Sequence, residues 1–115
     1  MINRLEITGV HFAVDDDIRS YTTQKIGKLD KYVSRHTREN LHAEVKLKAG
    51  KAKNKQAFTC EVILGLTGEN FVLKESGRTM PEAIDLAEEK LKIHLKKYKD
   101  THTNHKLHQR IIAKL

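Results

Sequence analysis

The stretch that decides the fold is residues 41–66, LHAEVKLKAGKAKNKQAFTCEVILGL, in which apolar and polar side chains alternate along two runs. Since successive side chains of a strand point to opposite faces, each run predicts a strand with one buried face. The buried faces are predicted to consist of Leu41, Ala43, Val45 and Leu47 in the first run, and of Phe58, Cys60, Val62, Leu64 and Leu66 in the second. A turn at Gly50, followed by Lys51, Lys53 and Lys55, predicts a basic hairpin tip between them.

Two shorter strands flank this hairpin. Residues 67–70, TGEN, have the composition of a turn, and residues 71–76, FVLKES, are short enough to form a strand, so two adjacent hairpins favour a meander. Near the amino terminus, Leu5 and Ile7 alternate with polar residues in a strand that ends at Gly9. We therefore expect four strands, most of them antiparallel.

Two further segments have the period of amphipathic helices. In residues 15–35, Asp15 is the expected N-cap, because its carboxylate accepts hydrogen bonds from amides of the first turn. In residues 76–99, Thr79 and Glu82 form a capping box, and Pro81 is tolerated in the first turn. The apolar stripes are predicted to be Ile18, Tyr21, Ile26, Leu29, Tyr32 and Val33 on the first helix, and Met80, Ile84, Ala87, Leu91, Leu95 and Tyr98 on the second.

The predicted fold class is α+β. The order β-α-β-β-β-α gives two layers, with both helices packed on one face of a four-stranded, mostly antiparallel sheet, as in double-stranded-RNA-binding domains. With 115 residues, 38% of them hydrophobic, the chain can bury one modest core. We expect this domain to span residues 1–100 and residues 101–115 to form a basic, flexible tail, in which Leu107, Ile111 and Leu115 are spaced for a short helix.

Composition excludes several classes of protein. A net charge of +7 indicates an anionic partner, whether RNA, DNA or an acidic protein. The sequence has no membrane-length apolar run and no signal peptide, and one cysteine suits a reducing compartment, so we expect a soluble, cytoplasmic protein. It contains no phosphate-binding glycine loop and no paired acid/base motif. We therefore expect no enzyme, no cofactor and no small-molecule substrate.

Histidine and cysteine residues raise the question of a metal site. His102, His105 and His108 have a suggestive three-residue spacing, but no cysteine or carboxylate accompanies them in the tail, so we expect no metal. No nearby histidine is placed to activate Cys60, so packing is the favoured interpretation of that residue.

Lysine and arginine residues gather beside the apolar stripes of both helices. At roughly 100° per residue, four on the first helix lie within an arc of about 120°. If the helices pack side by side, the two basic edges are placed to line one groove that meets RNA phosphates. A solvated surface, or lysines that complement a helix dipole, is an equally good interpretation of the sequence alone. The candidate residues are Lys25, Lys28, Lys31 and Arg35 on the first helix, and Lys90, Lys96, Lys97 and Lys99 on the second.

Two motifs then carry a specific resemblance. Residues 18–32, IRSYTTQKIGKLDKY, and the pattern SG-x-x-M-x-x-AID-x-x-x-x-KL-x-x-x-L-x-K-x-K over residues 76–99 resemble the ribosome hibernation-promoting factor and ribosome-associated inhibitor A (protein Y) family. The similarity runs from about residue 2 to residue 99. It implies a hibernation factor that binds the small ribosomal subunit, with its 16S-type rRNA, in the channel for mRNA and the A- and P-site tRNAs. Such a factor inhibits translation, under stress or in stationary phase, without chemistry.

By matching position, the resemblance assigns rRNA contacts to Lys25, Lys28, Lys90 and Lys97. The chain ends before the dimerisation domain of long-form members, so it resembles the short type unless it is a trimmed part of a longer protein. Two positions depart from the family pattern. Ile93 stands where many members have arginine, with Lys92 beside it expected to point elsewhere, and Pro81 stands where an aromatic residue is common.

Leu86 and Ile93 are seven residues apart and are expected to lie opposite the core stripe. We consider self-association there, or docking of the tail, against the ordinary case of scattered exposed apolar residues. Two rival functions also stay open: a general double-stranded-RNA-binding module, and a protein-interaction modulator of a transcription factor. The acidic start of the second helix argues against the first rival, and the second predicts binding with little salt dependence.

Overall fold

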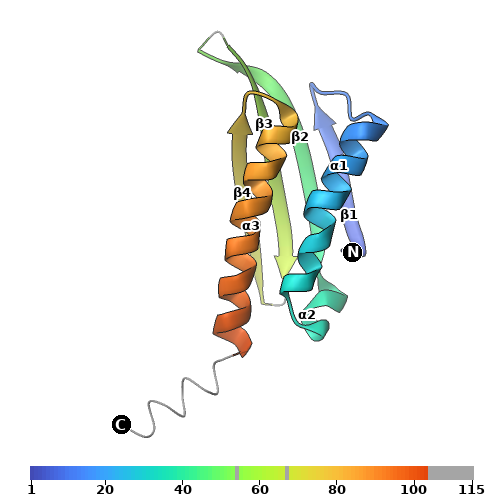
Figure 1. Cartoon of the computed structure of the whole chain (residues 1–115), viewed down its shortest axis with the longest axis vertical. Coiled ribbons are helices and arrows are strands. Elements are labelled where there is room, and N and C mark those ends of the chain that lie inside the picture. Colours follow the sequence, from blue (N-terminus) through green and yellow to red (C-terminus); the bar gives the residue numbers. More distant parts are fainter. Residues whose placement is uncertain (54, 67, 104–115) are drawn as a thin grey trace, which may run out of the picture.

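The structure of the protein is a computed structural model that describes residues 1–53, 55–66 and 68–103, with side chains placed except at 52 and 99–103. A sheet of four strands is covered on one face by α1 and α3, which lie side by side (Figure 1). The predicted α+β class is therefore confirmed. The elements are β1 (Arg4–Val10), α1 (Asp16–Gly27), the 3-10 helix η1 (Lys28–Tyr32), α2 (Arg35–Asn40), β2 (His42–Ala52), β3 (Lys55–Leu66), β4 (Glu69–Gly77) and α3 (Met80–Thr103).

The strands follow one another across the sheet in the order β1-β2-β3-β4. β1 runs parallel to β2, with Ile7 opposite Val45, while the β2–β3 and β3–β4 pairs are antiparallel. In the last pair Val62 lies opposite Leu73. The sheet is thus mostly antiparallel, as the two predicted adjacent hairpins favour.

The core lies between the sheet and the helix layer. The alternating faces predicted for β2 and β3 are those that point toward the helices, and Val45, Leu47 and Val62 are fully buried there. Ile26 of α1 and Leu91 of α3 cover them and are fully buried too. Burial of such side chains contributes about 1.5–3 kcal/mol each to folding, so the two amphipathic patterns together fix the layer arrangement.

The helix starts follow the predicted caps. The Asp15 carboxylate accepts from the backbone N–H of Ile18 at 2.8 Å, and the Thr79 hydroxyl accepts from the N–H of Glu82 at 3.2 Å. α3 therefore begins at Met80 with Pro81 in its first turn, and the proline does not disturb the helix start.

The prediction of one continuous helix to residue 35 is wrong. α1 ends at Gly27, η1 follows, and Val33 is extended before α2 begins, with Ser34 as its N-cap. The physical cause is Gly27, which is a poor helix former and whose carbonyl oxygen accepts from the N–H of Ile2 at 2.9 Å. Arg35 consequently lies on α2, and its predicted arc with the lysines of the first helix does not form.

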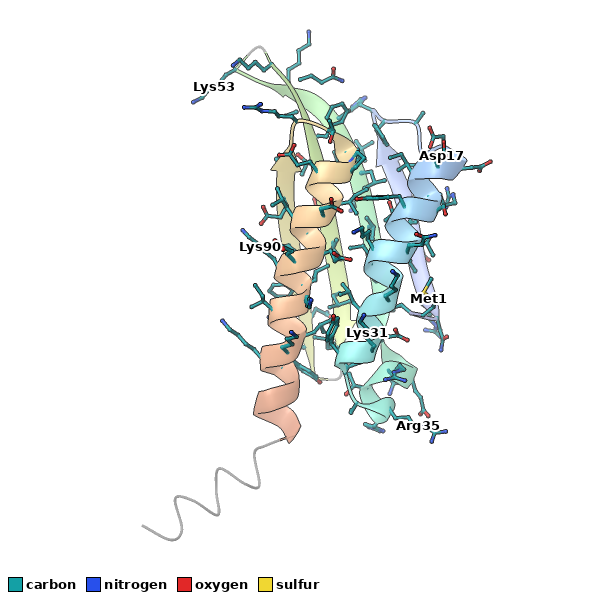
Figure 2. All side chains as sticks on the ribbon, in the orientation of Figure 1. Met1, Asp17, Lys31, Arg35, Lys53 and Lys90 are labelled. Carbon is teal, nitrogen blue, oxygen red and sulfur yellow. The ribbon has the colours of Figure 1, made fainter. Side chains whose placement is uncertain are left out.

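The position of the central turn also differs from the prediction. Gly50 pairs with Ala57 inside the β2–β3 ladder, and the strands continue to Ala52 and Lys55. Lys53 lies beyond them in the left-handed region, with φ of 54°, and marks the tip of the hairpin (Figure 2). We call this the hairpin end of the molecule, and the opposite end, where α2 lies, the α2 end.

Candidate nucleic-acid interface

The contact between α1 and α3 is acidic in its part nearer the hairpin end. The Tyr21 hydroxyl donates a 2.5 Å hydrogen bond to the Asp85 carboxylate, which also lies 3.6 Å from the Lys25 ammonium. Lys25 lies 4.0 Å from Glu88 as well. The charge of Lys25 is therefore matched within the protein, although the sequence placed this residue among the RNA contacts.

Farther toward the α2 end, three lysines surround one aromatic ring. The ammonium nitrogens of Lys31, Lys92 and Lys96 lie 5.2, 5.5 and 5.5 Å from the centroid of the half-buried Tyr32 ring. These distances are within the range of cation–π attraction. We call Lys31, Lys92 and Lys96 the lysine cluster; among the side chains that the structure places, none of the three has a carboxylate partner.

The lysine cluster also changes the acidity of Tyr32. Partial burial opposes ionisation of the Tyr32 hydroxyl, but hydrogen bonding to Lys92 and the positive charges of Lys31 and Lys92 outweigh it and lower its pKa. A lowered hydroxyl pKa is consistent with positive potential at this point of the surface.

Lys90 and Lys97 lie on the other side of α3, facing β4. Lys90 forms a 2.5 Å ion pair with Glu75 of β4, and Lys97 lines a shallow groove with Phe71 and His94. Figure 2 shows Lys31 and Lys90 on opposite sides of α3. The single groove expected between the basic edges of the two helices is therefore not formed by these residues. Lys92 is rotated by about 200° around the helix axis from Lys90, and Lys96 lies one turn after Lys92. These two residues therefore lie on the side of α3 that faces η1.

The remaining candidate residues lie toward the α2 end or outside the placed side chains. Lys28 begins η1 and Arg35 begins α2, where Figure 2 shows Arg35 at the end of the molecule; both are exposed. Lys28, Arg35 and Lys97 have no ion pair within the described part of the chain. Lys99 is in α3, but its side chain is outside the described set.

Sequence reasoning missed two members of this surface. Tyr32 was interpreted only as part of the apolar stripe, and Lys92 was expected to point elsewhere than the RNA contacts. The available signal was the spacing of Lys92 and Lys96, which are one helical turn apart and thus share a side of α3. What the sequence does not contain is the position of η1, which brings Tyr32 and Lys31 to that side.

The apolar pair proposed on the outer surface of α3 is only partly exposed. Ile93 has 55% of its surface accessible, whereas Leu86 is half-buried. Ile93 lines the same groove as Phe71 and His94, whose rings stack 3.6 Å apart between centroids. The expected tail ligands of this pair, Leu107, Ile111 and Leu115, lie outside the described residues.

Other candidate chemistry gains no support from the geometry. Cys60 is fully buried, and burial raises the pKa of its thiol to about 12. Over the residues that the structure describes, no three His, Cys, Asp or Glu side chains are grouped to bind a metal ion, and no helix is long and apolar enough to span a membrane. The side chains of His102, His105 and His108 are outside that set.

These observations define a class of protein: a two-layer α+β domain whose helix layer carries lysines without an ion pair among the placed side chains. Residues 5–103 match the family described as Sigma 54 modulation protein / S30EA ribosomal protein. The chain belongs to this family, as the motifs of the two helices suggest.

Relatives and solved structures agree with this assignment. The chain is 35% identical over 96 residues to a ribosome hibernation promotion factor of Lactococcus lactis subsp. cremoris, covering 84% of this chain and 49% of the relative. It is 32% identical over 107 residues to the factor of the same name from Staphylococcus aureus, covering 93% and 53%. The chain thus spans about half the length of these curated relatives.

The N-terminal domain of Protein Y from Thermus thermophilus superposes with a TM-score of 0.67 at 26% identity, over 81% of this chain and 94% of that domain. A ribosomal subunit interface protein from Coxiella burnetii superposes with a TM-score of 0.68 at 18% identity, over 84% and 97%, which shows the shared fold.

Proposed function

We propose that the protein is a ribosome hibernation factor. In this proposal it binds the small ribosomal subunit in the channel for mRNA and the A- and P-site tRNAs, and it inhibits translation in the cytoplasm under stress or in stationary phase. It acts by occupancy, without enzymatic chemistry and without a cofactor. The names of the relatives support a ribosomal role, and the channel itself is our inference from the family resemblance.

The observation that carries the proposal is a set of unpaired cations on the helix layer near the α2 end. Lysine side chains bind phosphate as mobile point charges, and each phosphate contact releases counterions from the nucleic acid. A lysine that is already paired with a carboxylate must give up that pair to contact a phosphate, so it contributes less to binding. The candidate cations of this surface that have no ion pair among the placed side chains include Lys28, Lys31, Arg35, Lys92, Lys96 and Lys97.

The proposed rRNA contacts therefore differ in strength. Lys28, Lys31, Lys96 and Lys97 are free to meet phosphates, and Arg35 extends the surface onto α2. Lys25 and Lys90 must first exchange an internal carboxylate for an RNA phosphate, so we assign them weaker contacts. Lys99 stays a proposed contact on grounds of sequence alone.

The two rival functions make different predictions. A general double-stranded-RNA-binding module would bind duplex RNA without preference for ribosomal particles. A modulator of a transcription factor would bind a protein with little salt dependence. The unpaired helix-layer cations favour RNA over the second rival, because they can pair with phosphates. Salt strongly screens that attraction, so RNA binding should depend on salt where the second rival predicts little dependence.

The test is co-sedimentation of the purified chain with small ribosomal subunits over a salt series. If four to six phosphates are contacted, the logarithm of the association constant falls with the logarithm of salt concentration with a slope of roughly −3 to −5. We expect saturation at one copy per subunit and competition by tRNA. Binding to duplex RNA of equal strength, or a slope near zero, would contradict the proposal.

Self-association or tail docking at Leu86 and Ile93 stays a prediction. Hydrogen–deuterium exchange of the tail amides measures docking directly, and sedimentation equilibrium of Ile93→Ser beside the unaltered chain measures self-association. Complete exchange within seconds together with a monomer at all concentrations would leave the pair as ordinary surface residues.

A further inference from the structure

We propose that Tyr32 and the lysine cluster form a phosphate-binding site that receives backbone phosphates of an RNA strand. The inference rests on the proposed function, because it names the part of the helix layer that meets the RNA. It adds Tyr32 and Lys92, which neither the motifs nor the family resemblance assigned to binding.

The geometry of the site comes from two separate elements that pack against each other. η1 contributes Tyr32 and Lys31, and α3 contributes Lys92 and Lys96 from consecutive turns. Because all three ammonium nitrogens lie 5.2–5.5 Å from one ring centroid, three positive charges converge on a single aromatic side chain. The half-buried ring has few rotamers, so it fixes where the flexible lysine stems gather.

The electrostatics of the cluster favour an anion. Three like charges gathered around one ring repel each other, and within the described side chains the compensating contact that they share is cation–π attraction to Tyr32. Within the described side chains no carboxylate forms an ion pair with the three lysines, whereas Lys25, Lys48 and Lys90 each form at least one. A bound phosphate therefore converts repulsion into attraction at the cluster.

The neighbouring acidic contact limits the path of the strand. Asp85 and Glu88 lie on the same side of α3 as Lys92, toward the hairpin end, and both lie within 4.0 Å of Lys25. Their carboxylates repel phosphate, so an RNA strand that contacts Lys92 is expected to continue over Lys96 and η1 toward the α2 end. Phosphates repeat regularly along a strand, which suits the spacing of lysines from consecutive turns better than a single carboxylate of an acidic peptide does.

The first arm of the test uses Lys92→Gln/Lys96→Gln in the small-subunit assay. Removing two phosphate contacts should reduce affinity at 0.1 M salt roughly 5- to 10-fold for each lysine and should make the salt slope shallower by about 1.5. The matched control is Lys53→Gln/Lys55→Gln at the hairpin end, which removes the same charge and should change the slope little. Urea midpoints of all variants check that the fold is retained.

The role of the ring is tested separately. Tyr32→Phe keeps the π face and should bind as tightly as the unaltered chain, whereas Tyr32→Leu removes it and should bind several-fold more weakly. If both variants bind like the unaltered chain, the ring does not take part and the proposal for Tyr32 is wrong.

The second arm distinguishes this inference from the proposed function. NMR spectra of the full chain are titrated with a 12-nucleotide single-stranded RNA and, in parallel, with inorganic pyrophosphate. RNA should shift the Tyr32 ring signals and the Lys92 amide. If the unaltered chain fails to bind subunits, the hibernation proposal fails, while shifts at Tyr32 with RNA still support the site. If subunits bind but the double variant binds equally well, only the site is wrong. Tighter binding of pyrophosphate than of RNA would overturn the RNA strand as its occupant.

Discussion

The hydroxyl group of Tyr21 on α1 donates a 2.5 Å hydrogen bond to the Asp85 carboxylate on α3, and this contact belongs to the acidic part of the helix layer, toward the hairpin end. The same carboxylate lies 3.6 Å from the Lys25 ammonium. One acidic residue of α3 thus joins the two helices and also neutralises a lysine that the sequence assigns to RNA. If Lys25 contacts RNA as proposed, stability and binding are linked at Asp85.

A tyrosine titration should detect this hydrogen bond. The bond to Asp85 first, then burial and the charges of Asp85 and Glu88, raise the pKa of Tyr21 from 10.0 to about 12. Because the folded-state pKa exceeds the unfolded one, the stabilisation is fully present below pH 10 and is lost as the pH rises toward 12. In absorbance at 295 nm, one of the three tyrosines should titrate near pH 12, and Asp85→Asn should lower that value. An unchanged titration in this variant would contradict the assignment.

Lys25 and Lys28 should contribute unequally to RNA binding. Lys25→Gln removes one positive charge from α1 and Lys28→Gln one from the adjoining η1, but only Lys25 has carboxylate partners among the placed side chains. We expect Lys28→Gln to make the salt slope of small-subunit binding shallower by about 0.9, and Lys25→Gln by less than half as much. The two variants are each other's control; equal losses would show that Lys25 leaves Asp85 and Glu88 on binding.

Much of the fold could be predicted from sequence because period and caps are local signals. The alternation at Val45 and Val62, and the caps Asp15 and Thr79, depend on neighbours in the chain. The end of α1 could not be predicted this way, because the carbonyl of Gly27 accepts from Ile2, which is remote in sequence. The prediction of a turn at Gly50 was wrong for a different reason, since glycine is also tolerated within a pair of strands, and Gly50 pairs with Ala57 there.

The site was predicted less completely than the fold. Helix geometry identifies which lysines share a side of one helix, and it identified Lys90 with Lys97 correctly as neighbours. It does not say which element that side meets. Pairing of Lys90 with Glu75, and the approach of Tyr32 to Lys92, depend on how η1, α3 and β4 pack. Tertiary contacts therefore decide which cations are without an internal carboxylate partner and thus available to the proposed RNA ligand.

Removal of the Glu75 carboxylate should make Lys90 available to phosphate. Lys90 lies 2.5 Å from Glu75, so Glu75→Gln is expected to raise affinity for small subunits up to about fivefold and to make the salt slope steeper by about 0.9. Glu69→Gln is the matched control, because it also removes one carboxylate from β4, but one that contacts His94 instead of a lysine. Equal effects of both variants would indicate that the change in net charge, and not the release of Lys90, alters the affinity.

The protein should lose stability in acid through one carboxylate, Glu61, which lies on the sheet face that the helices do not cover. Glu61 is only 8% exposed and lies 2.8 Å from Lys48 and 3.7 Å from Lys74. Hydrogen bonding to Lys48 outweighs burial and lowers the pKa of Glu61 below 4.5, so its stabilisation is present above that pH and is lost as the pH falls through the folded-state value. Urea unfolding at pH 7 should show Glu61→Gln less stable by about 1–2 kcal/mol. The difference between the two proteins should narrow as the pH falls through the folded-state pKa of Glu61; a difference that stays constant throughout the acid range would exclude ionisation as the cause.

Two glycines should respond in opposite ways to alanine. A Cβ at Gly27 would lie 3.2 Å from the Sδ atom of Met1, the flexible end of a side chain, and the residue has helical φ of −62°. Alanine favours a helix over glycine, so Gly27→Ala should stabilise the protein by about 0.5–1 kcal/mol once Met1 moves. A Cβ at Gly9 would meet the backbone oxygen of Phe12 at a separation that no rotamer change relieves, so Gly9→Ala should destabilise by about 1–3 kcal/mol. Urea midpoints of both variants measure the difference, and destabilisation by Gly27→Ala would mean that the contact between Met1 and α1 is rigid.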